Sequence, residues 1–76
     1  MNDAVKKTLD LKGEKCPKPI LASREALKSF LPGDVLKVVS TDPLSKSDFE
    51  VFARMKNITL LKVEEQDGAF IFYLQK

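Results

Sequence analysis

Two kinds of hydrophobic pattern alternate along the chain, one with the period of a strand and one with the period of a helix. Residues 8–12 alternate polar and apolar positions, which predicts a short strand with two leucines on its buried side. Residues 20–31 space their apolar positions three and four apart, which predicts an amphipathic helix. Residues 35–40 are rich in β-branched side chains and are typical of a second strand.

A second helix is predicted after the turn at residues 42–43. Ser45 or Ser47 can cap it, because Ser47 stands three residues before Glu50, the spacing of a capping box. Asn57 is suited to end the helix in the left-handed conformation. The predicted apolar side of this helix comprises Phe49, Phe52, Ala53 and Met55.

Two last strands are predicted over residues 59–64 and 69–74, joined by Asp67-Gly68, a dipeptide typical of tight hairpins. The element order is then βαβαββ, and a strand, a helix and a strand in succession favour a right-handed crossover between parallel strands. Because each helix has one apolar stripe, we expect an α/β (α+β) two-layer sandwich. Its four-stranded mixed sheet carries both helices on one face and leaves the other face largely exposed.

Composition restricts the classes of protein and of site. The 76 residues, 43% hydrophobic and 32% charged, predict a single domain over residues 1–76, with residues 1–7 as a flexible N-terminal extension. We find no signal-peptide or membrane-span pattern, so we expect a cytoplasmic protein without membrane contacts. The single cysteine allows no disulfide within the chain, and with no histidine we expect neither a metal nor another cofactor.

The only cysteine, Cys16, lies between the first predicted strand and the first predicted helix. Pro17 and Pro19 follow it and suit a helix start, because the N–H groups that they lack would have no intrahelical partner. Cys16 is therefore predicted at or next to the N-cap, where partial positive charge and free N–H groups favour a thiolate. With prolines at the first and third helical positions, the nearest remaining donor is the N–H of Lys18. We expect a lowered thiol pKa.

Charged residues gather around this cysteine in the sequence. Lys12, Lys15 and Lys18 lie within a few residues of it and are interpreted either as a solvated face or as thiolate stabilisation and partner docking. The loops after the first two strands of a parallel crossover lie at the same edge of the sheet. Asp42 is therefore expected beside Cys16, as a turn residue that can also orient the loop.

One set of motifs resembles the TusA/SirA-like family of small sulfur-carrier proteins. The motifs are Leu9-Asp10-x-x-Gly13-x-x-Cys16-Pro17-x-Pro19, Pro32-Gly33-Asp34, and Asp42-Pro43 followed by Asp48. The resemblance implies that Cys16 accepts a persulfide sulfur from a cysteine desulfurase or similar donor and passes it to an acceptor protein. In the family such relays serve tRNA thiolation, molybdenum-cofactor assembly or sulfur oxidation. The predicted site is catalytic Cys16 with supporting Gly13, Lys15, Pro17, Lys18, Pro19 and Asp42.

The sequence fits other classes of cysteine protein less well. The absence of histidine argues against a cysteine protease or acyltransferase, and the absence of a resolving cysteine argues against a disulfide oxidoreductase. The alternative is a non-catalytic binding module or transcriptional regulator that docks protein or RNA through its basic Cys16 end. Alternation separates Tyr73 from Phe70 and Phe72 on the last strand, so we interpret the phenylalanines as core and do not expect direct nucleic-acid binding.

Overall fold

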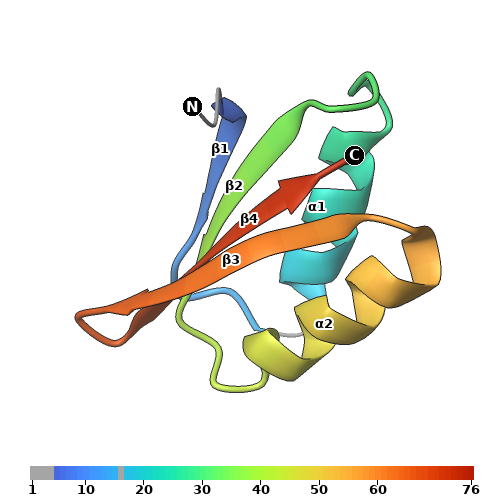
Figure 1. Cartoon of the computed structure of the whole chain (residues 1–76). Coiled ribbons are helices and arrows are strands. Elements are labelled where there is room, and N and C mark those ends of the chain that lie inside the picture. Colours follow the sequence, from blue (N-terminus) through green and yellow to red (C-terminus); the bar gives the residue numbers. More distant parts are fainter. Residues whose placement is uncertain (1–4, 16) are drawn as a thin grey trace.

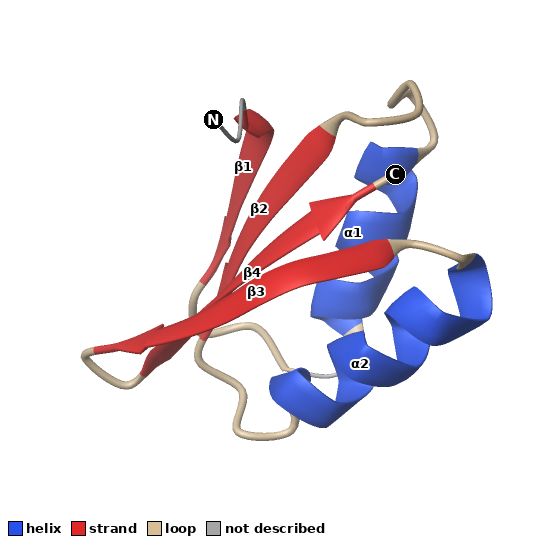
Figure 2. Ribbon diagram, viewed as in Figure 1, coloured by secondary structure: helices blue, strands red, loops and turns tan. Residues whose placement is uncertain are grey.

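The computed structural model describes residues 5–15 and 17–76 (Figure 1). The sheet order is β1-β2-β4-β3, with β1 parallel to β2 and both other neighbouring pairs antiparallel. Both helices lie on one face of this sheet (Figure 2), which confirms the predicted two-layer α+β sandwich. The elements are β1 (Val5–Leu11), α1 (Lys18–Leu27), β2 (Val35–Ser40), α2 (Ser45–Lys56), β3 (Thr59–Gln66) and β4 (Ala69–Gln75).

Strand β1 begins three residues earlier than the hydrophobic pattern predicts. Val5 is already paired with Val35 of β2, with a register shift before Lys7. Residues 5–7 are therefore part of the sheet, and the prediction of a flexible extension over residues 1–7 is wrong for them, while residues 1–4 lie outside the described part of the chain. The pattern missed this start because two successive lysines interrupt the polar and apolar alternation, and main-chain pairing with β2 outweighs it.

Helix α1 ends at Leu27, four residues before the predicted end. The N–H of Phe30 donates to the carbonyl of Leu27 at 3.1 Å, a tightened last turn that buries the Phe30 ring. Leu31 was predicted on the apolar stripe, but 66% of it is exposed. Its position directly before Pro32 disfavours helical backbone and turns its side chain out of the stripe.

Helix α2 begins without the predicted serine cap. Ser45 Oγ donates to the carbonyl of Asp42 at 2.6 Å and Ser47 Oγ donates to the carbonyl of Leu44 at 3.2 Å, so both hydroxyls bond backward. The helix has no side-chain cap. Asn57 ends it in the left-handed conformation with φ 56°, as predicted. Met55 is 75% exposed and not part of the apolar side, since it lies about 200° around the helix from Ala53.

The core lies between the two helices and the inner face of the sheet. The rings of Phe49 and Phe72 are its centre, with centroids 4.5 Å apart and no exposed surface. Leu9 and Leu11 of β1 pack against this core from the edge of the sheet and are half-buried. The central cluster comprises Leu27, Phe30, Leu36, Val38, Phe49, Phe52, Phe72 and Leu74.

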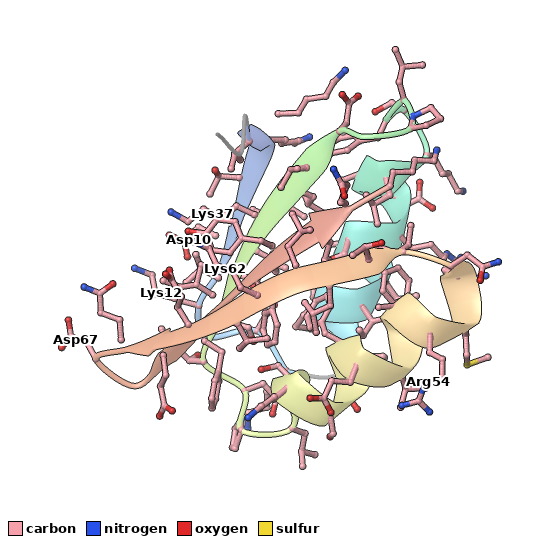
Figure 3. The ribbon with its side chains drawn as sticks, viewed as in Figure 1. Asp10, Lys12, Lys37, Arg54, Lys62 and Asp67 are labelled. Carbon is pink, nitrogen blue, oxygen red and sulfur yellow. The ribbon has the colours of Figure 1, made fainter. Side chains whose placement is uncertain are left out.

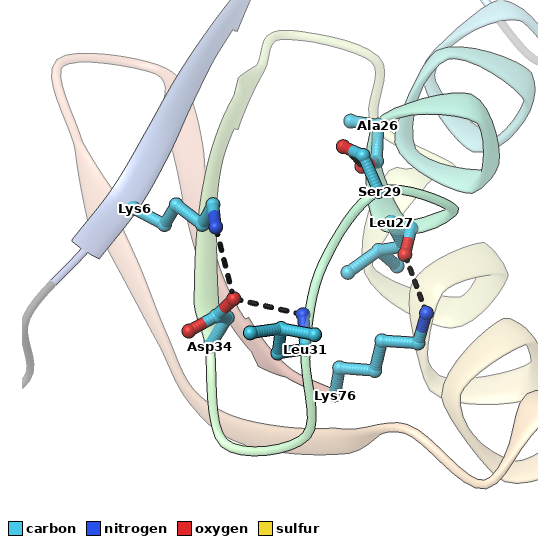
Figure 4. A network of polar contacts seen from close by, with 7 residues as sticks. All are labelled: Lys6, Ala26, Leu27, Ser29, Leu31, Asp34 and Lys76. Atoms are coloured by element: carbon cyan, nitrogen blue, oxygen red, sulfur yellow. Dashed lines mark hydrogen bonds and ion pairs between the residues drawn. The ribbon is translucent and has the colours of Figure 1, made fainter.

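Four connections between the elements lie at the two ends of the sheet. The Asp67-Gly68 turn has φ values of 53° and 79°, the geometry of the tight hairpin predicted between β3 and β4. The loop from β1 to α1 and the loop from β2 to α2 lie at the same end of the sheet (Figure 1). At the other end, Asp34 Oδ2 accepts hydrogen bonds from Leu31 N–H at 2.8 Å and from Lys6 Nζ at 3.2 Å (Figure 4).

Candidate functional site

The two loops at the candidate site are joined by a hydrogen bond. The N–H of Gly13, after β1, donates to Thr41 Oγ1, after β2, at 2.9 Å. Gly13 has φ 86°, a conformation that costs glycine little and lets the chain turn immediately after the strand. The loops enclose a small pocket of about 180 Å³ lined by residues 13–15 and 41–43. Cys16, the predicted catalytic residue, follows this segment and lies outside the described residues.

Helix α1 starts one residue later than predicted. Pro17 is the N-cap, with φ −96° and ψ 12°, and its carbonyl accepts the N–H of Leu21 at 3.0 Å. Pro19 is the second helical residue and is fully buried, whereas Pro17 is exposed. The helix start is therefore anchored in the core at Pro19, while the residue next to Cys16 faces solvent.

The N–H of Lys18 has a backbone acceptor, while its predicted bond to the sulfur of Cys16 lies outside the described residues and stays a prediction. This group donates to the carbonyl of Lys15 at 2.9 Å. It therefore already has a hydrogen-bond partner in the protein. The sequence pattern could not show this, because the bond forms only in the folded chain.

Two of the three predicted lysines are paired with carboxylates. Lys12 Nζ lies 3.8 Å from Asp10, and Lys18 Nζ, on the first residue of α1, lies 3.5 Å from Glu14 in the preceding loop. Lys15 forms no ion pair with any residue of the described ranges. The three lysines are matched by three carboxylates, those of Asp10, Glu14 and Asp42, which lines the same pocket as Lys15, so no net positive charge remains near the site. The side chains of both ion pairs are well exposed, so each pair contributes little.

Asp42 is buried at the site, with only 9% of its surface exposed. Its Oδ1 accepts the N–H of Leu44 at 3.0 Å, and its own N–H donates to Ser40 Oγ at 3.2 Å. These bonds form an Asx-type turn that fixes the loop into α2. The same pocket includes Gly13 and Lys15, so the predicted proximity of the two loops is confirmed. The contribution of Asp42 to chemistry at Cys16 stays a prediction.

An apolar groove between the two helices borders the site and was not predicted. Its volume is about 360 Å³. Val51 and Met55 project from α2 one turn apart and are 46% and 75% exposed. Two apolar residues spaced four apart, next to the apolar side of α2 that packs in the core, were the signal in the sequence that could have predicted this groove. Exposed apolar surface of this kind marks interaction sites. The groove is lined by Pro17, Ile20, Asp48, Val51, Phe52, Met55 and Lys56.

The open face of the sheet carries a second group of charged residues. Tyr73 lies between Lys37 and Lys62 of the neighbouring strands, whose Nζ atoms are 5.9 Å and 4.7 Å from its ring centroid. The two lysines are labelled in Figure 3. The Tyr73 hydroxyl also donates to Glu64 Oε1 at 3.4 Å. The two lysine contacts with the ring are cation–π interactions, and they account for the presence of a tyrosine on this face of the sheet.

Two carboxylates with lowered pKa values lie near the end of α1 that is far from the site. The backbone N–H of Leu31, with help from Lys6, lowers the pKa of Asp34. A hydrogen bond from Lys28 lowers the pKa of Glu25.

Within the described ranges, no three side chains of the acidic or thiol type lie close enough together to hold a metal ion. No helix in that part of the chain is long and apolar enough to cross a membrane.

Comparison with known proteins gives the family. The model of the family described as sulfurtransferase TusA matches residues 7–76. A putative sulfur carrier protein of Neisseria meningitidis is 47% identical over 68 residues, 90% of this chain and 92% of its own. Sulfur carrier protein TusA of Allochromatium vinosum is 40% identical over 68 residues, 90% of each chain. A solved SirA-like protein of Desulfitobacterium hafniense shares the fold, with a TM-score of 0.81 at 22% identity over 91% of this chain and 95% of that one. Because the family match spans nearly the whole sequence, this chain belongs to the TusA family.

Proposed function

We propose that this protein is a sulfur carrier in which Cys16 holds the transferred sulfur as a persulfide. The Cys16 thiolate attacks the outer sulfur of a donor persulfide, the donor S–S bond breaks, and the donor thiolate leaves. An acceptor thiolate then attacks the outer sulfur on Cys16 and restores the Cys16 thiolate. Each step exchanges one S–S bond for another, so no external oxidant or reductant is required.

The surroundings of Cys16 support this proposal. Lys15 and Pro17, its two neighbours, are exposed, while Pro19 is buried and holds the start of α1 in the core. A carrier requires this combination, because the sulfur must be reached by two partners in turn from a fixed position. The observation that carries the proposal is the location of the only cysteine in the sequence. It lies between the start of α1 and the loop after β1, which is hydrogen-bonded to the loop after β2 through Thr41.

Membership of the TusA family implies the kinds of partner. The donor is a cysteine desulfurase or another persulfide protein, and the acceptor is a protein thiol of a relay that leads to tRNA thiolation, molybdenum-cofactor assembly or related sulfur metabolism. The apolar groove beside Pro17 offers these partners a contact surface next to the sulfur. A free carrier thiol persists in the reducing cytoplasm, where we place the protein.

Loading with sulfur tests the proposal. The protein is incubated with a cysteine desulfurase and L-cysteine, and its intact mass is measured. We expect a gain of one sulfur atom that a reductant removes and that is absent in Cys16→Ser. An unchanged mass with several active desulfurases, or the same gain in Cys16→Ser, would contradict the proposal and favour a binding module without sulfur chemistry.

A further inference from the structure

A second cavity lies between the C-terminal parts of the two helices, outside the candidate site. Its volume is about 190 Å³, and its apolar floor is formed by Leu27, Phe52 and Ile58. No acidic side chain lines it, whereas four of its seven lining side chains are cationic. These are Arg24, Lys28, Lys56 and Lys76.

Contacts within the protein compensate only part of this positive charge. Lys28 pairs with Glu25 at 2.9 Å, and Lys76 Nζ donates to the carbonyl of Leu27 at 2.8 Å (Figure 4). Arg24 and Lys56 form no ion pair with any residue in the described part of the chain. Each helix C-terminus contributes roughly half a negative charge, Glu25 lies near Lys28 and Arg24, and Lys76 helps to lower the pKa of the Asp34 carboxyl, so four cations against these groups leave roughly one positive charge.

From this combination we infer that the cavity binds an acidic segment of a partner protein. One apolar side chain of the segment lies on the floor formed by Phe52 and Ile58. Its carboxylates lie beside Arg24 and Lys56, which form no ion pair with a carboxylate of the described residues. A purely apolar ligand would leave these charges uncompensated, and a highly charged ligand without an apolar group would leave the floor in contact with water.

The location of the cavity relates it to sulfur transfer, and in this respect the inference rests on the proposed function. Helix α1 has ten residues and is about 15 Å long, and the cavity lies along its last turn, from Arg24 to Lys28, whereas Cys16 precedes its first turn. Phe52 and Lys56 line both the cavity and the apolar groove beside Pro17, so the two form one path along the helices. A partner held at the cavity therefore remains close to the sulfur without covering it.

Fluorescence polarisation with a labelled peptide tests the inference. The probe is a short peptide with a central leucine flanked on both sides by glutamates. Two further peptides replace either the leucine by glycine or the glutamates by glutamines. The protein variants are Lys56→Glu, in the cavity, and Lys46→Glu, the same charge change on the first turn of α2 and outside the cavity. Circular dichroism checks that both variants fold.

We expect the acidic leucine peptide to bind best. Lys56→Glu should weaken it about ten-fold, because an attractive exposed pair becomes a repulsive one, and Lys46→Glu should weaken it less than two-fold. Removing either the leucine or the glutamates should weaken binding as well. Absence of binding, equal effects of the two variants, or equally tight binding of an oligouridine of the same charge would overturn the inference.

These outcomes separate the inference from the proposed function. Peptide binding involves no sulfur, so Cys16→Ser should bind the probe as the unaltered protein does. Normal sulfur loading without peptide binding contradicts the cavity assignment alone. Peptide binding without sulfur loading contradicts the carrier function alone.

Discussion

Replacing Thr41 by valine removes the hydroxyl that joins the two loops of the site while keeping the shape of the side chain. Gly13 N–H then loses its acceptor at 2.9 Å. A neutral hydrogen bond contributes about 0.5–1.5 kcal/mol, and because this one is exposed, water replaces part of it and we expect about 0.5–1 kcal/mol. The loss should be mainly local, since Thr41 is outside the core cluster. Thr59→Val is the matched control, because Thr59 is also exposed and its side chain forms no hydrogen bond among the described residues.

Amide hydrogen exchange at Gly13 is the direct assay of this change. A loss of about 0.5–1 kcal/mol in local stability predicts exchange faster by about two- to five-fold in Thr41→Val and unchanged in Thr59→Val. The rate of sulfur loading should fall in the same variant, because the segment that leads to Cys16 is held less firmly. Unchanged exchange at Gly13 together with unchanged loading would refute the reasoning that this bond positions the site.

Three further changes test other parts of the account. The pKa of Asp34 is lowered, so its contribution to stability is present above the ordinary carboxyl pKa and is lost as pH falls through the lowered value. In urea unfolding, Asp34→Asn should therefore be less stable than the unaltered protein at neutral pH and should lose less stability on acidification. Parallel pH profiles of the two proteins would contradict this. Phe72→Ala should cost about 3–5 kcal/mol of unfolding free energy, because the ring is fully buried against Phe49, whereas Tyr73→Ala on the open face should cost far less; equal losses would be inconsistent with the assigned core. Met55→Asp should change the unfolding free energy by no more than about 0.5 kcal/mol relative to the unaltered protein, because the side chain is exposed. It should nevertheless slow sulfur loading by a desulfurase. An unchanged loading rate would argue against the groove as a partner surface.

Local signals predicted much of the fold because each acts within a few residues. Asn57 and Asp67-Gly68 adopt the left-handed geometries that these residue types favour, and they mark the end of α2 and the hairpin. The apolar period of each helix placed both on one face of the sheet. The early start of β1 was missed because its lysine-rich beginning is defined by pairing with β2, which a local pattern does not contain.

The site was predicted in outline but not in its polar contacts. The proximity of Asp42 to Gly13 follows from the parallel crossover and was therefore accessible to sequence reasoning. The hydrogen bond that occupies the N–H of Lys18, and the ion pair between Lys18 and Glu14, form only in the folded chain. Exposure of Met55 was also missed, because the residue type favours burial and only its angle around α2 places it outside the core.

Delivery of the sulfur tests the central claim most directly. The protein is loaded by a desulfurase, separated from it, and mixed with an acceptor protein thiol while the intact masses of both are followed. A carrier should lose one sulfur atom from Cys16 as the acceptor gains one, and the recovered protein should accept sulfur again. A loaded sulfur that stays on the protein, or that leaves only as free sulfide while no acceptor gains mass, would contradict the account.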